Sequence, residues 1–121
     1  RYADAFKDLK FIPAAILVGT VVSKPSEGLI CLNLGHKSVA SEMDFPRLKL
    51  LNMNNLKQVS HSEEHLVVEC NGSDEYSVGM ICYAIPTHIC PTVPKYEKVL
   101  TVIDGEVTGD WKVAARDHST K

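Results

Sequence analysis

From residue 78 the chain reads Val78-Gly79-Met80-Ile81-Cys82-Tyr83-Ala84, and it continues as Ile85-Pro86-Thr87-His88-Ile89-Cys90-Pro91-Thr92-Val93. The first half is an apolar run that predicts a buried strand. Pro86 and Pro91 then end strand pairing, because proline has no backbone N–H to donate to a sheet. The stretch therefore predicts a core strand that leads into a short loop between two prolines.

His88 and Cys90 are the candidate metal ligands within that loop. In an extended backbone, side chains two positions apart point the same way, so an imidazole nitrogen and a thiolate sulfur can face one ion while Ile89 turns into apolar packing. Two ligands make an incomplete site, since catalytic zinc usually takes three protein ligands. The others must come from elsewhere in the chain, a partner or a substrate. The alternative is a hydrogen-bonded histidine beside a buried cysteine.

Strands are predicted on both sides of this stretch, because β-branched runs alternate with turn residues. An Asp104-Gly105 pair between two such runs is a strong hairpin signal. The predicted strands are residues 14–23, 29–34, 56–60, 64–70, 78–85, 98–103 and 106–114, with one short strand in an irregular connection over 39–55. We expect a single domain over 1–121, mainly β, a compact β-barrel or sandwich of short antiparallel strands with little helix. Trp111 is predicted in the core, and residues 1–10 as a helical turn or an arm.

Composition limits the classes of function. Of the 121 residues 45% are hydrophobic and 23% charged, with a net charge of −2, which is typical of a soluble domain and argues against nucleic-acid or acidic-membrane partners. No apolar run reaches the length of a membrane span, and no segment is expected to act as a signal peptide. All four cysteines lie in apolar, strand-like surroundings, which predicts reduced thiols in a cytoplasmic protein: Cys31, Cys70, Cys82 and Cys90. The start at Arg1 suggests an excised part of a larger protein.

Two further patterns imitate known motifs. His61-Ser62-Glu63-Glu64-His65 has the His-x-x-Glu-His spelling of one class of zinc peptidase, which requires a helix, whereas the residues that follow favour a strand. A polar loop edge is the preferred interpretation. Gly35-His36-Lys37-Ser38 lacks the spacing of a phosphate-binding loop and is predicted to be a solvated turn.

Several segments, taken in order, resemble the C-terminal domain of the D-threonine aldolase and D-serine dehydratase family. The most specific is Pro86-Thr87-His88-Ile89-Cys90-Pro91-Thr92-Val93, combined with the upstream Ser62-Glu63-Glu64-His65. The resemblance runs from about Tyr2 to Arg116, and the other segments are Thr20-Val21-Val22-Ser23-Lys24-Pro25, Leu32-Asn33-Leu34-Gly35-His36-Lys37 and Trp111-Lys112-Val113-Ala114-Ala115-Arg116.

The resemblance implies a role in a larger enzyme. Members are fold-type III pyridoxal phosphate enzymes, related to alanine racemase, in which an N-terminal barrel carries the cofactor on a lysine and the C-terminal β-domain brings a divalent metal beside it. The resemblance implies that His88 and Cys90 are the metal ligands, for zinc or manganese. It places the cofactor lysine outside this chain, which by itself is expected to be inactive. The implied partners are a small D-amino acid, the barrel of the same enzyme, and a second subunit in a homodimer.

The resemblance also leaves alternatives open. The family usually has Asp-Ala-Gly-x-Lys where this chain has Asn33-Leu34-Gly35-His36-Lys37, so a carboxylate is missing. Cys at the second ligand position leans toward zinc-using dehydratases, whereas Asp is typical of manganese-using aldolases. Pro86, Pro91 and Thr92 are expected to shape the loop, and Glu63, Glu64 and His65 are candidates for a supporting role or an interface. The rival is a β-barrel interaction module without chemistry, in which His88 and Cys90 only pack.

Overall fold

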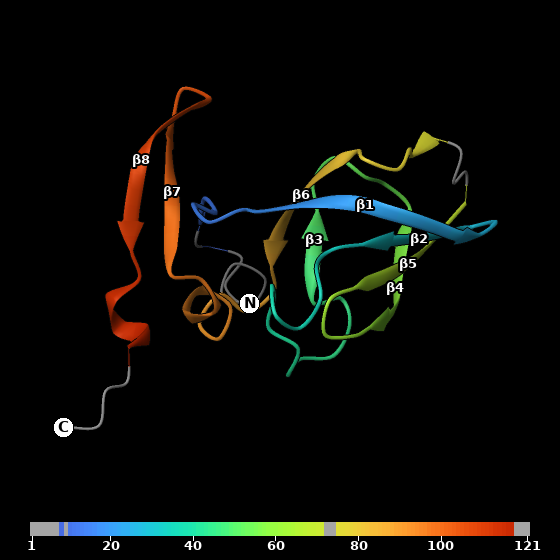
Figure 1. Ribbon diagram of the computed structural model, residues 1–121, viewed down its shortest axis with the longest axis horizontal. Coiled ribbons are helices and arrows are strands. Elements are labelled where there is room, and N and C mark those ends of the chain that lie inside the picture. Colours follow the sequence, from blue (N-terminus) through green and yellow to red (C-terminus); the bar gives the residue numbers. More distant parts are fainter. Residues whose placement is uncertain (1–7, 9, 72–74, 118–121) are drawn as a thin grey trace.

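The computed structural model describes residues 8, 10–71 and 75–117. Six strands form one antiparallel sheet in the order β3-β6-β1-β2-β5-β4, which curls into a half-barrel (Figure 1). These strands are β1 (Leu17–Ser26), β2 (Leu29–Leu32), β3 (Leu48–Leu50), β4 (Leu56–His61), β5 (Leu66–Cys70) and β6 (Ile81–Pro86). Among the described residues helix is limited to short 3-10 turns, such as η2 (Val93–Lys95) and η3 (Ala114–Arg116). The predicted mainly-β class is confirmed.

The core follows the alternation of buried and exposed residues along the strands of the curled sheet. On β5, Leu66 and Val68 are fully buried while Glu69 is exposed, and β6 alternates in the same way. Such alternation is typical of an antiparallel sheet with one face packed and the other solvated. The largest fully buried side chains are Ile30, Leu32, Leu34, Leu48, Leu66, Val21, Val39, Val68, Thr92 and Cys82.

The first hairpin is longer than the sequence indicated. The predicted turn covered residues 24–28, but β1 continues to Ser26 and only two residues separate it from β2. The pairing shifts register between Val21 and Ser23 and again between Ser23 and Ser26. Such bulges accommodate a proline within a strand, here Pro25. Gly28 completes the turn with a positive φ of 73°.

The two edges of the sheet, β3 and β4, are joined by a side chain. Gln58 on β4 accepts a hydrogen bond from the backbone N–H of Arg47 at 2.9 Å, and its amide donates to the carbonyl of Leu48 at 2.6 Å. The Gln58 amide thus satisfies one backbone donor and one acceptor at the start of β3. The connection before β3 is thereby held against β4.

A second, two-stranded sheet lies to one side of the half-barrel (Figure 1). It consists of β7 (Lys98–Ile103) and β8 (Glu106–Lys112), joined at Asp104-Gly105, where both residues have positive φ values of 50° and 84°. This is the predicted hairpin, with the conformation that Asp-Gly turns favour.

The prediction that Trp111 belongs to the core was wrong. Its side chain is 71% exposed, and every residue of β8 is exposed. Trp111 pairs with Val99 across the hairpin, in a sheet separate from the core strands. An alternating apolar pattern indicates a strand with one apolar face, but it does not show what that face packs against.

The predicted arm at residues 1–10 lies almost entirely outside the described residues. No helix in the described part of the chain is long and apolar enough to cross a membrane.

Candidate functional site

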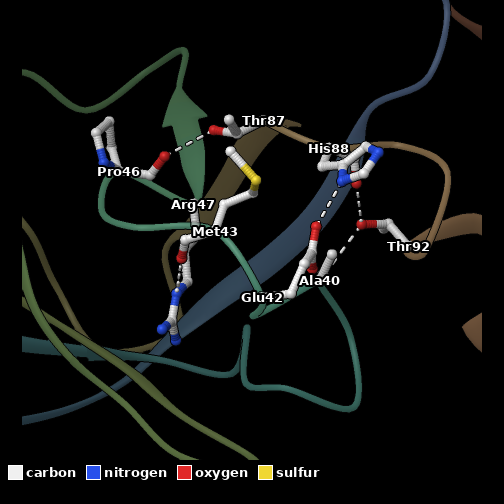
Figure 2. A network of polar contacts seen from close by, with 8 residues as sticks. All are labelled: Ala40, Glu42, Met43, Pro46, Arg47, Thr87, His88 and Thr92. Carbon is white, nitrogen blue, oxygen red and sulfur yellow. Dashed lines mark hydrogen bonds and ion pairs between the residues drawn. The ribbon is translucent and has the colours of Figure 1, made fainter. Parts of the chain in front are cut away.

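The loop that carries His88 begins where β6 ends. Pro86 is buried and pairs with Leu48 at the last position of the ladder. The next residue, Thr87, donates its backbone N–H to the Arg47 carbonyl at 2.9 Å and its hydroxyl to the Pro46 carbonyl at 2.7 Å. The loop therefore leaves β6 with its first residue fixed against the segment that precedes β3 (Figure 2).

Cys90 lies in a turn rather than in a strand. The backbone N–H groups of Thr92 and Val93 both donate to the Ile89 carbonyl, at 3.0 and 2.9 Å. Because β6 ends at Pro86, the two-residue alternation expected of an extended strand does not continue to Cys90. Ile89 is 42% exposed, although it also lines a small apolar hollow with Leu17.

Cys90 is exposed, which corrects the expectation that all four cysteines lie in apolar, strand-like surroundings. All four cysteines are free, and three are buried on β2, β5 and β6 as predicted. Burial raises the pKa of the Cys82 thiol and of the Cys70 thiol, which keeps them protonated. Cys90 alone of the four is exposed, so its thiol is accessible to a ligand from outside this domain.

Thr92 ties the loop to a distant segment. Its side chain is 1% exposed, and its hydroxyl accepts the backbone N–H of Ala40 at 3.0 Å and donates to the carbonyl of His88 at 2.8 Å (Figure 2). One buried hydroxyl thus satisfies a backbone N–H 52 positions away and a backbone carbonyl four positions away. This confirms that Thr92 shapes the loop.

Replacing Thr92 by valine is expected to lower the free energy of unfolding by about 1–3 kcal/mol, because the N–H of Ala40 and the carbonyl of His88 lose their buried partner. Urea unfolding measures the change. The matched control is Thr108→Val, which removes an exposed hydroxyl from β8 and should stay within about 0.5 kcal/mol of the wild type. Equal effects of the two substitutions would contradict the role of Thr92.

His88 contacts a carboxylate that the sequence did not point to. Its Nδ1 lies 2.5 Å from Oε1 of Glu42, in the irregular connection before β3 (Figure 2). A hydrogen bond from its own backbone N–H, and then the bond with the His88 ring, hold the pKa of the Glu42 carboxyl below its usual range. Among the described residues the ring makes no other side-chain hydrogen bond, so its Nε2 stays available.

The described residues offer few metal-binding groups near His88 and Cys90. Within residues 8, 10–71 and 75–117, no three His, Cys, Asp or Glu residues group closely enough to hold a metal ion. His88 and Cys90 offer an imidazole nitrogen and a sulfur, which are donors that zinc accepts. They could supply part of a coordination shell, with the rest from outside this domain.

The peptidase-like segment is a hairpin turn. His61 ends β4, Leu66 begins β5, and the residues between them close through a hydrogen bond from the Ser62 N–H to the His65 carbonyl at 2.8 Å. The two histidines therefore do not stand one helical turn apart, and the peptidase geometry is absent from this segment. The preference for a polar loop edge is confirmed.

The turn over residues 35–38 packs against that hairpin. The backbone N–H groups of His36 and Lys37 donate to the carbonyls of Ser62 and Glu63, at 2.8 and 3.0 Å, so they are not free to bind a phosphate. The Lys37 ammonium pairs with Glu64 at 2.5 Å, and hydrogen bonding and charge from Glu64 raise the pKa of Lys37. This turn is less solvated than predicted.

Asn33, which stands where the family pattern has a carboxylate, contacts β1. Its side-chain oxygen accepts the backbone N–H of Thr20 at 2.6 Å, and its own N–H donates to the Thr20 carbonyl at 3.1 Å. An amide oxygen serves this purpose as well as a carboxylate oxygen. Asn33 therefore holds the segment after β2 against β1.

Two histidines, His36 and His61, lie beside Arg47. The rings of His36 and His61 meet edge to face at 4.4 Å, and Arg47 Nη1 donates to His61 Nδ1 at 2.8 Å. The other nitrogen, His61 Nε2, donates to the carbonyl of Leu34 at 2.8 Å. Burial lowers the pKa of His61, the Leu34 carbonyl opposes this, and the charges of His36 and Arg47 add to the lowering.

Acidification should destabilise the fold through His61. Its folded pKa lies below the ordinary histidine value of about 6.5, so the unfolded chain takes up the proton first as the pH falls. The contribution is fully present above about pH 6.5 and is lost as the pH falls through the folded pKa. The free energy of unfolding is measured with urea at about pH 7.5 and about pH 5.5. The decrease between the two pH values should be larger for the wild type than for His61→Asn. Equal losses would contradict the assignment.

Comparisons with known proteins identify the family of this domain. The family model described as "Putative serine dehydratase domain" matches residues 14–102, most of the chain. The chain belongs to this family. The serine dehydratase domain match contains the whole loop from Thr87 to Thr92 together with Glu42, and it ends within β7, before Trp111.

Relatives of this serine dehydratase domain are longer enzymes. D-threonine aldolase from Arthrobacter sp. is 29% identical over 112 residues, which is 92% of this chain and 29% of that protein. The D-threonine aldolase structure from Filomicrobium marinum matches with a TM-score of 0.77 and 23% identity, over 89% of this chain and 29% of that one. The resemblance to the D-threonine aldolase and D-serine dehydratase family is confirmed.

A dehydratase shares the fold as well. D-threo-3-hydroxyaspartate dehydratase from Delftia sp. HT23 matches with a TM-score of 0.67 and 15% identity, over 81% of this chain and 31% of that one. The same enzyme has been solved with a histidine replaced by alanine, and with a cysteine two positions later replaced by alanine in a metal-free form. At these identities the structural likeness shows the fold of the serine dehydratase domain.

Proposed function

We propose that this chain is the metal-bearing domain of a pyridoxal phosphate-dependent lyase that acts on D-3-hydroxy amino acids. The reaction is of the D-threonine aldolase type, which yields glycine and an aldehyde. The relationship to D-threonine aldolase over 92% of the chain supports this choice. Because the chain spans only 29% of that relative, the cofactor lysine is assigned to a separate barrel domain of the same enzyme.

The observation that carries the proposal is the pair His88 and Cys90 in one fixed loop. The imidazole is held by Glu42 through Nδ1, and the thiol two residues later is exposed. In D-threo-3-hydroxyaspartate dehydratase, a histidine and a cysteine with the same spacing were replaced, and the cysteine variant was solved in a metal-free form. This supports the assignment of His88 and Cys90 as metal ligands.

The donors fit a borderline-soft cation better than a hard one. A thiolate and a neutral imidazole suit zinc, whereas manganese favours carboxylate and water oxygens. The bound metal would supply Lewis-acid assistance at the substrate's β-hydroxyl, and pyridoxal phosphate would supply an electron sink for the α-carbon. With two ligands from this domain, positions remain for substrate, water or groups of the barrel.

The chain's own residues prepare the two donors. Thr87 and Thr92 fix both sides of the loop, so that His88 and Cys90 are presented by a constrained backbone. Glu42 contacts Nδ1 of the His88 ring, on the side away from Nε2. Cys90 must lose its proton to bind a cation, so we expect affinity to fall as the pH is lowered.

The proposal is tested in the longer enzyme that contains this chain, supplied with pyridoxal phosphate and zinc or manganese. D-threonine should give glycine and acetaldehyde in equal amounts, and the L-isomer should not react. Formation of ammonia and 2-oxobutanoate instead would overturn the aldolase assignment in favour of elimination, which the dehydratase relative makes the second candidate. Absence of turnover with all D-3-hydroxy amino acids would favour the non-enzymatic module.

The 121-residue chain alone should show no turnover under the same conditions, because the cofactor lysine is assigned to the barrel. Product formation by the isolated chain would contradict this division of roles.

A further inference from the structure

Two segments far apart in the sequence are tied together at the loop. The connection between β2 and β3 supplies Ala40 and Glu42, and the loop after β6 supplies His88 and Thr92 (Figure 2). Ala40 donates its N–H to the Thr92 hydroxyl, and Glu42 accepts from the His88 ring. The same short segment therefore fixes both the backbone of the loop and the ring that the loop carries.

The contact between Glu42 and His88 has a chemical consequence for the ring. A neutral imidazole carries one proton, on either Nδ1 or Nε2, and an ionised carboxylate can only accept. With Oε1 of Glu42 at 2.5 Å from Nδ1, the neutral ring must hold its proton on Nδ1. The lone pair is then on Nε2, and the ring orientation is fixed by a bond at the opposite atom.

We propose that Glu42 is the positioning residue of the site: it selects the Nδ1–H tautomer of His88 and aims Nε2 at the cation. The cation part of this inference rests on the proposed function, whereas the tautomer part does not. Metal-binding histidines commonly donate their second ring N–H to a carboxylate, and loss of such a partner typically costs about 10–100-fold in metal affinity.

Two other roles for Glu42 make different predictions. An ordinary surface ion pair would have no effect on the tautomer of the neutral ring, and exposed pairs contribute little to stability. The Glu42 side chain is 46% exposed, so exposure alone does not decide between these roles. A direct ligand role would require a carboxylate oxygen of Glu42 to bind the metal. Oε1 already contacts His88, so this role would fall to Oε2.

The first arm of the test reads the tautomer without metal. The 121-residue chain is labelled with ¹⁵N-histidine, and the ring nitrogens of His88 are assigned by comparison with His88→Ala at a pH where the ring is neutral. The wild type should show a protonated Nδ1 and an unprotonated Nε2. Glu42→Gln should keep this pattern, since its amide oxygen still accepts, whereas Glu42→Ala should move toward the Nε2–H form. An unchanged pattern in Glu42→Ala would overturn the proposal.

The second arm reads cobalt affinity in the longer enzyme, by competition with a chelating dye. Glu42→Ala should bind Co²⁺ about 10–100-fold more weakly than the wild type, with partial recovery in Glu42→Gln. A loss in Glu42→Gln as large as in His88→Ala would show a direct ligand and contradict the positioning role. If the wild type and His88→Ala bind Co²⁺ equally, the proposed function fails, and the first arm still decides the tautomer.

Discussion

Replacing Gly35 by alanine is expected to prevent stable folding of this domain. A Cβ at this position would lie 2.2 Å from the carbonyl oxygen of Glu63 and 2.3 Å from the carbonyl carbon of Glu64. Both are backbone atoms of the hairpin turn after β4, so no side-chain rotation relieves the clash. Separation of the two segments would also break the hydrogen bonds that His36 and Lys37 donate to that turn.

Gly35→Ala is expected to lower the free energy of unfolding by about 4 kcal/mol or more. This is a large part of the roughly 5–15 kcal/mol that stabilises a typical domain. Urea unfolding, or the yield of folded protein, measures it. Gly109→Ala is the matched control, because its Cβ would meet only the Thr101 hydroxyl at 3.5 Å, an ordinary contact. A Gly35→Ala protein as stable as Gly109→Ala would show that the close approach of these turns is wrong.

If the proposed function holds, replacing His88 by alanine in the proposed longer enzyme is expected to lower kcat/KM by more than about 100-fold. Loss of a residue that only supports a metal ligand commonly lowers metal affinity or activity by about 10–100-fold, and loss of the ligand itself should have a larger effect. The fold should survive, because the side chain is 29% exposed and contributes little to the core. Product formation from D-threonine and metal content are measured together.

The control for His88→Ala is Lys57→Ala, which removes an exposed side chain from β4. Its activity should stay near that of the wild type. If His88→Ala kept full activity and metal content, the ligand assignment would fail whatever the effect of Lys57→Ala.

Local signals predicted most of the fold. Asp104-Gly105 identified a hairpin because only a few residue pairs adopt two successive positive φ values easily. The β-branched runs located five of the six strands of the curled sheet, and even the short β3 fell within the connection where one strand was expected. Trp111 was misplaced, because alternation gives the faces of a strand and not the contacts of the sheet that contains it.

The candidate site was only half visible in the sequence. His88 and Cys90 could be found because two ligand-type residues stand together between prolines. Glu42 could not, since it lies in a segment without periodicity and meets His88 across 46 positions. A contact of that kind depends on the path of the whole connection between β2 and β3, which no local pattern encodes.

The most direct test of the account is the absorption spectrum of the longer enzyme loaded with Co²⁺. A thiolate bound to Co²⁺ gives a sulfur-to-metal charge-transfer band in the near ultraviolet. We predict this band for the wild type, its loss in Cys90→Ser, and the loss of stoichiometric binding in His88→Ala. A Cys90→Ser protein with the same charge-transfer band as the wild type would contradict the claim that His88 and Cys90 together bind the metal.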